Sequence, residues 1–156
     1  GILYLKDGNR VQFTHDSYME YYSALEIFKH QRSDEIKLID NFFAENEVDE
    51  IWVTFPDPQP SKARKRLTGP NFLERYRKFL KQDGVVNLKT DSDLMYEFTV
   101  ETAKEANYPI YYNYDNLYAN EDDLEVKKIR TYYEQIWLDK GLTIKYIRFG
   151  IRPESK

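Results

Sequence analysis

The sequence has 156 residues, of which 41% are hydrophobic and 16% aromatic, and this predicts one globular domain with a buried core. It contains no cysteine and two histidines, which excludes disulfides and cysteine-ligated zinc and disfavours a histidine-rich metal site. The formal net charge is −4, and no apolar stretch approaches the ~20 residues of a membrane helix. With no signal-peptide pattern at the N-terminus, we expect a soluble, cytoplasmic protein.

Residues 1–32 form the least informative part of the chain, and we leave them unassigned. Within them, Gly1–Asn9 suggests a hairpin arm and Ser17–Phe28 an amphipathic helix. The following stretch, Gln31–Phe43, begins charged and becomes apolar, which indicates another helix. We assign residues 33–156 to a single domain.

Strands and helices alternate from Glu50 onwards. Glu50–Phe55 predicts a buried strand that prolines end, and Pro70 opens a helix. One face of that helix is apolar: Phe72, Leu73, Tyr76, Phe79 and Leu80. Asp83-Gly84 predicts a turn before the strand Val85–Thr90.

The second half of the chain continues this alternation. Asp91-Ser92 predicts the N-cap of a helix that ends near Ala106. The remaining segments are a strand, an irregular acidic stretch, a helix that Gly141 ends and a closing strand: Pro109–Tyr114, Leu117–Asp123, Glu125–Lys140 and Leu142–Ile151. Strand–helix alternation with short connections predicts an α/β fold with a largely parallel sheet.

Positive charge is concentrated between Ser61 and Lys81. This segment has eight basic residues and one acidic residue, although the whole chain is acidic. A dense basic stripe on an acidic protein indicates local phosphate contact, as in nucleic-acid binding. A solvated helix face is the alternative interpretation, and a charge run alone favours it.

Two acids follow the ends of consecutive predicted strands. Asp57 comes just after Phe55, and Asp91 directly follows Thr90. Because ligands bind beyond the carboxyl ends of strands in open α/β sheets, both carboxylates could face one crevice. The alternatives are an Asp-Pro turn residue for Asp57 and helix capping for Asp91.

Four ordered motifs between Ile36 and Phe149 resemble the tRNA (guanine-N(7)-)-methyltransferases. They are FPDPQPSKARKRLT, FLERY, the strand end LKTDS, and TYYEQIWLDKGLTIKYIRF. The resemblance implies a Rossmann-like class I methyltransferase fold, with a mostly parallel sheet and an antiparallel C-terminal strand. Residues 33–156 would then be the methyltransferase-like domain.

The resemblance implies transfer of a methyl group from S-adenosylmethionine to N7 of guanosine 46 in tRNA. Asp57 would be the catalytic acid and would border the cofactor, and Asp34 would lie near the adenine end of the cofactor. The positions that match substrate contacts are Ser61, Lys62, Arg64, Lys65, Asp91, Thr131, Tyr132, Tyr133 and Glu134. Arg66 would join the basic residues in holding phosphates. Without the resemblance, an ordinary amphipathic helix start is the preferred interpretation of the segment Thr131–Glu134.

One part of the family pattern is not found. The glycine-rich cofactor loop has no counterpart before Ser33, so we expect the N-terminal part of the domain to be incomplete or altered. A sheet truncated in this way exposes an edge, which favours a homodimer. The second hypothesis is a non-catalytic tRNA-binding module. A third, a DNA amino-methyltransferase, is disfavoured because Asp57–Pro60 lacks the adjacent prolines and the aromatic residue of that group.

Overall fold

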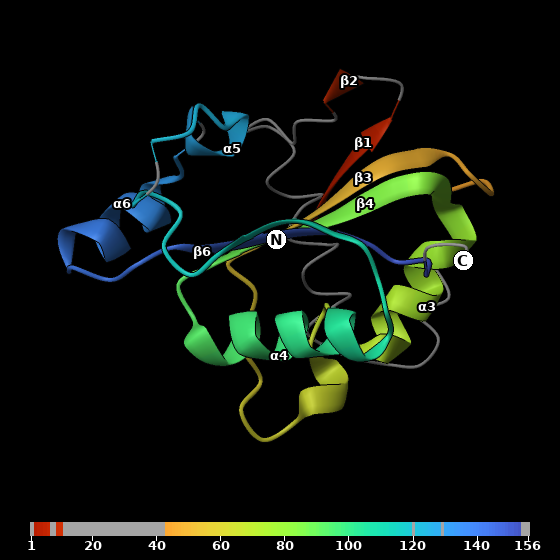
Figure 1. Ribbon diagram of the computed structural model, residues 1–156, viewed down its shortest axis with the longest axis horizontal. Coiled ribbons are helices and arrows are strands. Elements are labelled where there is room, and N and C mark those ends of the chain that lie inside the picture. The colour runs from red at the N-terminus through yellow and green to blue at the C-terminus, as the bar shows by residue number, and fades with distance from the viewer. Residues whose placement is uncertain (1, 7–8, 11–42, 120, 129, 154–156) are drawn as a thin grey trace, which may run out of the picture.

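A six-stranded sheet, with strand order β2-β1-β3-β4-β6-β5, forms the centre of the molecule (Figure 1). The computed structural model describes residues 2–6, 9–10, 43–119, 121–128 and 130–153. The strands are β1 (Ile2–Lys6), β2 (Asn9–Arg10), β3 (Val48–Thr54), β4 (Leu80–Thr90), β5 (Ile110–Tyr114) and β6 (Lys145–Gly150).

The sheet is mixed. In the described ranges β3 and β4 pair in parallel, joined by a helical crossover, whereas the β2–β1, β1–β3, β4–β6 and β6–β5 pairs are antiparallel. The α/β class, the N-terminal hairpin and the antiparallel C-terminal strand are therefore confirmed. The expectation of a mostly parallel sheet is corrected, because the strands on both sides of the β3–β4 pair, β1 and β6, run in the opposite direction.

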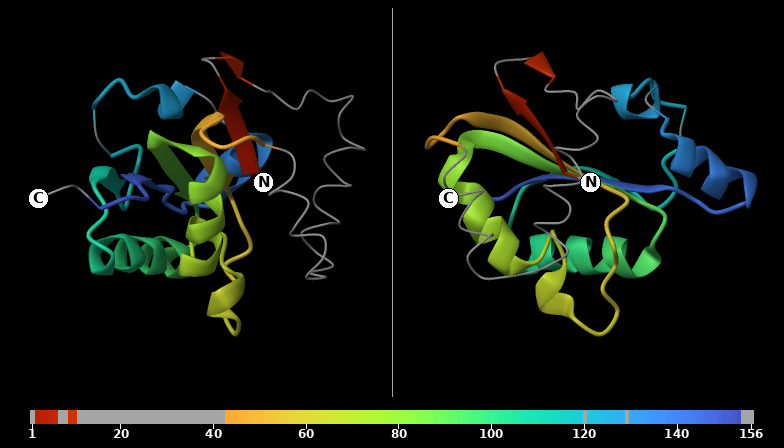
Figure 2. Two further views of the ribbon diagram at one scale, coloured as in Figure 1. Left: turned by 90° about the vertical axis from the view of Figure 1, so that its right-hand side faces the viewer. Right: turned by 180° about the vertical axis from the view of Figure 1, so that it is seen from behind.

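Helices connect the later strands. The helical segments in the described ranges are η2 (Ala63–Lys65), α3 (Pro70–Phe79), α4 (Asp93–Glu105), α5 (Glu125–Lys128) and α6 (Tyr132–Asp139). In this part of the chain, no helix is long and apolar enough to cross a membrane. Figures 1 and 2 show α3 and α4 together on one side of the sheet, and α5 and α6 near the end where β3 and β4 stop.

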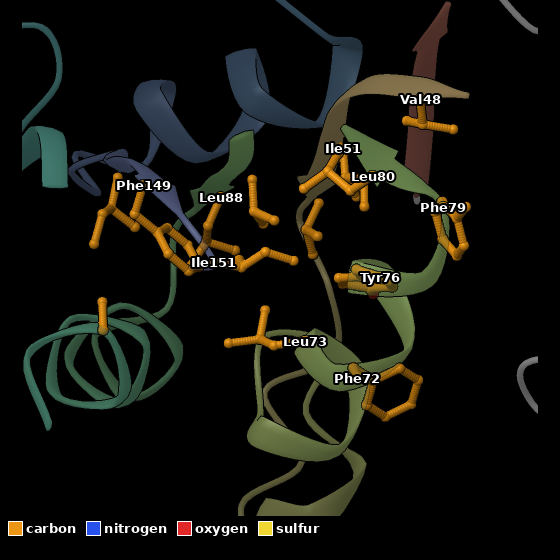
Figure 3. Packing of buried hydrophobic residues seen from close by; sticks show 14 of the residues in the cluster. Val48, Ile51, Phe72, Leu73, Tyr76, Phe79, Leu80, Leu88, Phe149 and Ile151 are labelled. Atoms are coloured by element: carbon orange, nitrogen blue, oxygen red, sulfur yellow. The ribbon is translucent and has the colours of Figure 1, made fainter. Parts of the chain in front are cut away.

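The main core lies between the sheet and the helices α3 and α4 (Figure 3). Phe72, Leu73, Tyr76 and Phe79 of α3 are buried, as their helical spacing predicts. They pack with Leu88 and other apolar side chains that alternate along the strands. Each such side chain stabilises the fold by about 1.5–3 kcal/mol through removal of apolar surface from water.

The other face of the sheet carries a second, smaller cluster. Leu117, Val126, Ile144 and Tyr146 are buried there, with Trp52 among the side chains packed around them. This cluster attaches α5, α6 and the segment between β5 and α5 to the sheet. It therefore places these elements beside the ends of β3 and β4.

Asp83-Gly84 does not form the expected turn, because both residues lie within β4. Val48 pairs with Leu80 and Glu50 with Val85, so the ladder contains an irregularity at this point. A Cβ on Gly84 would lie 2.6 Å from Cγ of Leu80. Glycine therefore fits this irregular point of the ladder, where a larger residue would collide with the Leu80 side chain of the same strand.

The single helix expected over Glu125–Lys140 is also corrected, since it is divided into α5 and α6. Thr131 is the N-cap of α6, and its side chain accepts a hydrogen bond from the amide of Glu134. The carboxylate of Glu134 accepts in turn from the amide of Thr131. This capping box begins a new helix at Tyr132.

Candidate functional site

The candidate site lies where β3 and β4 end side by side. Thr54 pairs with Lys89, and the amide of Phe55 donates to the carbonyl of Lys89 at 2.8 Å. The two strands are parallel neighbours, so the segments that carry Asp57 and Asp91 leave the sheet at the same edge. The structure thus confirms the placement that the sequence predicted for these acids, while their roles stay predictions.

Asp57 is exposed at the tip of a constrained loop. Its Oδ1 accepts a hydrogen bond from the amide of Gln59 at 2.9 Å, which is the turn geometry of the alternative interpretation. In the described part of the chain, its Oδ2 has no hydrogen-bond partner. Phe55 and Gln59 both have a positive φ, 46° and 45°, which is uncommon outside glycine. Such strained residues persist where the surroundings hold them, and they cluster at functional sites.

Arg66 provides part of that support, and its expected role is corrected. Its Nε donates to the carbonyl of Pro58 at 3.0 Å, and its guanidinium lies 4.4 Å from the ring centroid of Phe98. The residue is only 6% exposed. Arg66 therefore braces the loop from inside and is not available to hold a phosphate.

The other basic residues of the loop point to solvent. Ser61, Lys62 and Arg64 are exposed and Lys65 is partly exposed, around the short helix η2. No side chain caps η2, and its last turn is basic. These side chains form the part of the basic segment that can reach phosphates beside Asp57.

The C-terminal part of the basic segment lies at the opposite edge of the sheet. The helix α3 runs away from the Asp57 loop and leads directly into the start of β4. There Arg77 donates to the carbonyl of Ile151 and pairs with Glu74, while Lys81 pairs with Asp49. The basic stripe from Ser61 to Lys81 is therefore not one continuous surface.

Asp91 lies in the tight connection between β4 and α4. The cap of α4 is Ser92, whose Oγ accepts from the amide of Met95 at 3.3 Å, so Asp91 does not have the capping role of the alternative interpretation. The main-chain oxygen of Asp91 accepts from Nζ of Lys145 at 3.0 Å. Lys145 also forms an ion pair with Asp93 and donates to the carbonyl of Thr143. This lysine thus fixes the connection while the Asp91 side chain stays partly exposed.

The segment Thr131–Glu134 is tied to the same strand end. Nζ of Lys89, the second-last residue of β4, lies 2.8 Å from Oε1 of Glu134. Tyr118 donates its hydroxyl proton to the same oxygen. Burial lowers the pKa of Lys89, against the opposing effect of Glu134, and burial together with the hydrogen bond to Glu134 raises the pKa of Tyr118. Tyr118 therefore stays protonated and remains a donor.

The remaining predicted site residues differ in how far the structure describes them. Thr131 is exposed at the start of α6, and Tyr132 is 78% exposed. Tyr133 lies in α6, but its side chain is outside the described part, and Asp34 lies outside the described residues altogether. Among those that are described, no group of three or more histidine or acidic side chains is arranged to hold a metal ion.

Lys89, Lys145 and Tyr118 were missed at the sequence level. A signal existed for Lys89, because Asn87 and Lys89 alternate with the apolar residues Val86 and Leu88 in a predicted strand. A lysine in such a position needs a partner, since an unpaired buried charge is strongly unfavourable. Nothing in the local sequence indicated which acid that partner would be.

A family model described as a putative methyltransferase matches residues 14–147. The chain belongs to this family. The match begins within the segment 1–32 that was left unassigned from the sequence. The α/β sheet with helices on its faces agrees with the class I methyltransferase fold of this family.

Curated relatives carry the more specific name tRNA (guanine-N(7)-)-methyltransferase. One from Bacteroides fragilis is 50% identical over 121 residues, which are 78% of this chain and 48% of the relative. Others from Porphyromonas gingivalis and Christiangramia forsetii are 51% and 46% identical, over 75% and 76% of this chain and 48% and 54% of the relatives. The chain spans about half the length of these relatives. The expected resemblance to this enzyme family is confirmed.

The residues present offer only part of a cofactor site. Asp57 is the one described residue among the candidates for binding S-adenosylmethionine, and the sequence contains no glycine-rich loop to hold the methionine end. The described residues therefore do not by themselves fit this cofactor. What they can do chemically is accept hydrogen bonds from a base and neutralise phosphates next to it.

Proposed function

We propose that this chain supplies the guanosine-binding side of a tRNA (guanine-N(7)-)-methyltransferase. The reaction would transfer a methyl group from S-adenosylmethionine to N7 of guanosine 46 in tRNA. The observation that carries the proposal is the placement of Asp57 and Asp91 at one sheet edge, with exposed basic side chains directly beside Asp57. The names of the relatives support the coarser part of this proposal, methylation of a tRNA guanine at N7.

Separate groups would hold the base and the backbone of the RNA. Carboxylates accept hydrogen bonds, and guanine has N–H donors on its Watson–Crick edge. Asp57 and Asp91 are the proposed acceptors. Lys62, Arg64 and Lys65 are proposed to contact phosphates, since such contacts position a nucleic acid on a protein. Ser61 and the exposed Thr131 and Tyr132 are proposed to complete the substrate surface, with Tyr133 as a further candidate.

The chemistry requires orientation and charge stabilisation more than proton transfer. N7 of guanine carries no proton and presents a lone pair, so no general base is needed. As the new bond forms, the purine ring becomes positively charged. A carboxylate at Asp57 stabilises that developing charge, and fixed acceptors hold the ring in line for the transfer.

S-adenosylmethionine is proposed as the donor and would supply an electrophilic methyl group on a sulfonium. Asp57 is the described residue proposed to border it, and Asp34 is proposed to lie near its adenine end. The described residues do not form the binding site of the donor.

Methylation mapped to a single nucleotide tests the proposal. The protein is incubated with S-adenosylmethionine and an unmodified tRNA transcript, and N7-methylguanosine is located by aniline cleavage. We expect cleavage at guanosine 46 and none in a transcript with adenosine there. Methylation of neither transcript, or of other guanosines alone, overturns the proposal.

Ligand binding separates catalysis from simple RNA binding. Calorimetry with S-adenosylhomocysteine, the product form of the donor, measures whether this chain forms a donor site. Tight tRNA binding without any binding of S-adenosylhomocysteine at millimolar concentration would instead identify a non-catalytic tRNA-binding module.

We also propose a homodimer and a cytoplasmic location. Tyr111 and Tyr112 of the edge strand β5 are exposed, and such an edge can pair with a second copy. Sedimentation equilibrium tests the dimer, and a monomer at micromolar concentration would exclude it. The location follows from tRNA as the proposed substrate, and cell fractionation tests it.

A further inference from the structure

Glu134 is fully buried, and protein groups already occupy both of its carboxylate oxygens. Its exposed fraction is 0%. Oε1 accepts from Nζ of Lys89 and from the hydroxyl of Tyr118, and Oε2 accepts from the amide of Thr131. A carboxylate in this state has no exposed surface to offer a guanine base, and both of its oxygens already accept hydrogen bonds from protein groups.

Lys89 is also buried. Its side chain is 4% exposed, and Nζ also donates to the carbonyl of Val126, at 3.0 Å. Lys89 thereby joins the C-terminal end of β4 to α5 and to the start of α6. Asp91 lies two residues further along the chain. The same strand end therefore carries both the carboxylate proposed to bind guanine and the lysine that holds α6.

Hydrogen bonds within the first turn of α6 connect Glu134, and thus its pair with Lys89, to Thr131. The amide of Glu134 donates to Oγ1 of Thr131 at 3.2 Å, and the amide of Gln135 donates to the carbonyl of Thr131 at 3.1 Å. Arg130, next to Thr131 in the chain, packs on Tyr118, with its guanidinium 4.5 Å from the ring centroid of that tyrosine. Moving Glu134 would therefore move the exposed start of α6.

We propose that the Lys89–Glu134 pair is a positioning device and that Glu134 does not contact the guanosine. The pair holds the start of α6, with Thr131 and Tyr132, against the strand end that carries Asp91. This inference rests on the proposed function, and it reassigns Glu134 from substrate binding to support of its neighbours. The base contacts are left to the exposed groups around it.

Three variants distinguish positioning from contact: Lys89→Met, Glu134→Gln and the double variant. Each single variant leaves one buried charge without its partner, which is strongly unfavourable. The double variant is neutral, and glutamine at the third helical position still completes a capping box. Lys128→Met is the matched control, because it removes a lysine of α5 whose ion pair with Asp123 is exposed.

Hydrogen exchange tests the anchor without any RNA. We expect exchange at the amides of Glu134 and Gln135 to rise roughly tenfold or more in each single variant, because local opening no longer breaks a satisfied pair. The double variant should return most of the protection, and Lys128→Met should leave it unchanged. Unchanged protection in Lys89→Met overturns the proposal.

Binding to tRNA tests the consequence for the base. The measured quantity is the ratio of affinities for two transcripts, one with guanosine and one with adenosine at position 46. We expect the unmodified protein to prefer guanosine about fivefold or more, the size of one lost base contact. Each single variant should lose most of this preference, and the double variant should regain it.

Different results would contradict the positioning role of Glu134 and the proposed function of the chain. If the carboxylate of Glu134 contacts guanine, Glu134→Gln loses the preference and adding Lys89→Met does not restore it, which overturns the positioning role. If the unmodified protein binds both transcripts equally, the proposed function is overturned. In that case the exchange experiment still decides whether the pair anchors α6.

Discussion

Nζ of Lys145 lies 3.0 Å from the main-chain oxygen of Asp91, although the two residues are 54 positions apart in sequence. Lys145 is 5% exposed and begins β6, which runs antiparallel to β4. On the opposite face of the sheet, Lys89 binds Glu134. Two buried lysines thus hold the two segments that flank the end of β4, one on each face.

Lys145→Met is expected to loosen the Asp91 connection. It removes a charged donor from the carbonyls of Asp91 and Thr143, and losing a hydrogen bond to a charged group costs about 1.5–3 kcal/mol of unfolding free energy. Urea denaturation measures this change. Lys104→Met, at an exposed position on α4, is the control and should alter stability little. Equal stability of the two variants would contradict the role given to Lys145.

Asp57→Asn is expected to reduce methylation by about 10²–10³-fold, as for loss of a group that stabilises transition-state charge. Asparagine retains Oδ1, so the hydrogen bond from the amide of Gln59 and the loop conformation should persist. Affinity for tRNA should therefore stay close to normal. Methyl transfer is measured with labelled donor, and Asp83→Asn at the opposite edge is the control. A variant with full activity would remove Asp57 from the reaction.

Replacing Lys62, Arg64 and Lys65 together with alanine should weaken tRNA binding and reduce its salt dependence. Each lost phosphate contact lowers the slope of log K against log salt by about 0.7–0.9, so three contacts lower it by roughly 2–3. Fluorescence titrations at several salt concentrations measure the slope. Lys78→Ala, near the far end of α3, should leave it unchanged. The same slope in the triple variant would show that the loop cations are only solvated.

Arg66→Ala is expected to differ from this triple variant. It leaves the carbonyl of Pro58 without its donor and removes the stacking on Phe98, so we expect a loss of about 1–3 kcal/mol in stability. The salt slope of tRNA binding should change little, because Arg66 is buried. Thermal unfolding and the same titrations provide both numbers. A lower slope with unchanged stability would return Arg66 to the phosphate surface.

Thr131→Ala should lower stability by about 1 kcal/mol, because α6 loses its N-cap. Thr131→Ser keeps the hydroxyl and should behave like the unmodified chain. Chemical denaturation compares the two variants. If alanine and serine have the same effect, the capping box contributes nothing measurable.

Much of the fold could be predicted from local pattern. The spacing of Phe72, Leu73, Tyr76 and Phe79 defined both the existence of α3 and its buried face. Ser92 was predicted as part of the cap of α4, and Gly141 ends α6 with a positive φ of 76°. The single helix predicted over Glu125–Lys140 was wrong, whereas the alternative interpretation of Thr131–Glu134 as a helix start agrees with the capping box found there. Such signals depend on residues within one or two turns of each other.

The candidate site could be predicted only in outline. The sequence by itself determined that Asp57 and Asp91 follow two consecutive strands, and its ordered motifs determined the family. Only the tertiary structure decided that Arg66 and Glu134 are buried while Lys62 and Arg64 are exposed. The physical reason is that the environment of a charge depends on groups brought to it from distant parts of the chain. For Arg66 the group is the ring of Phe98, and for Glu134 it is the ammonium group of Lys89.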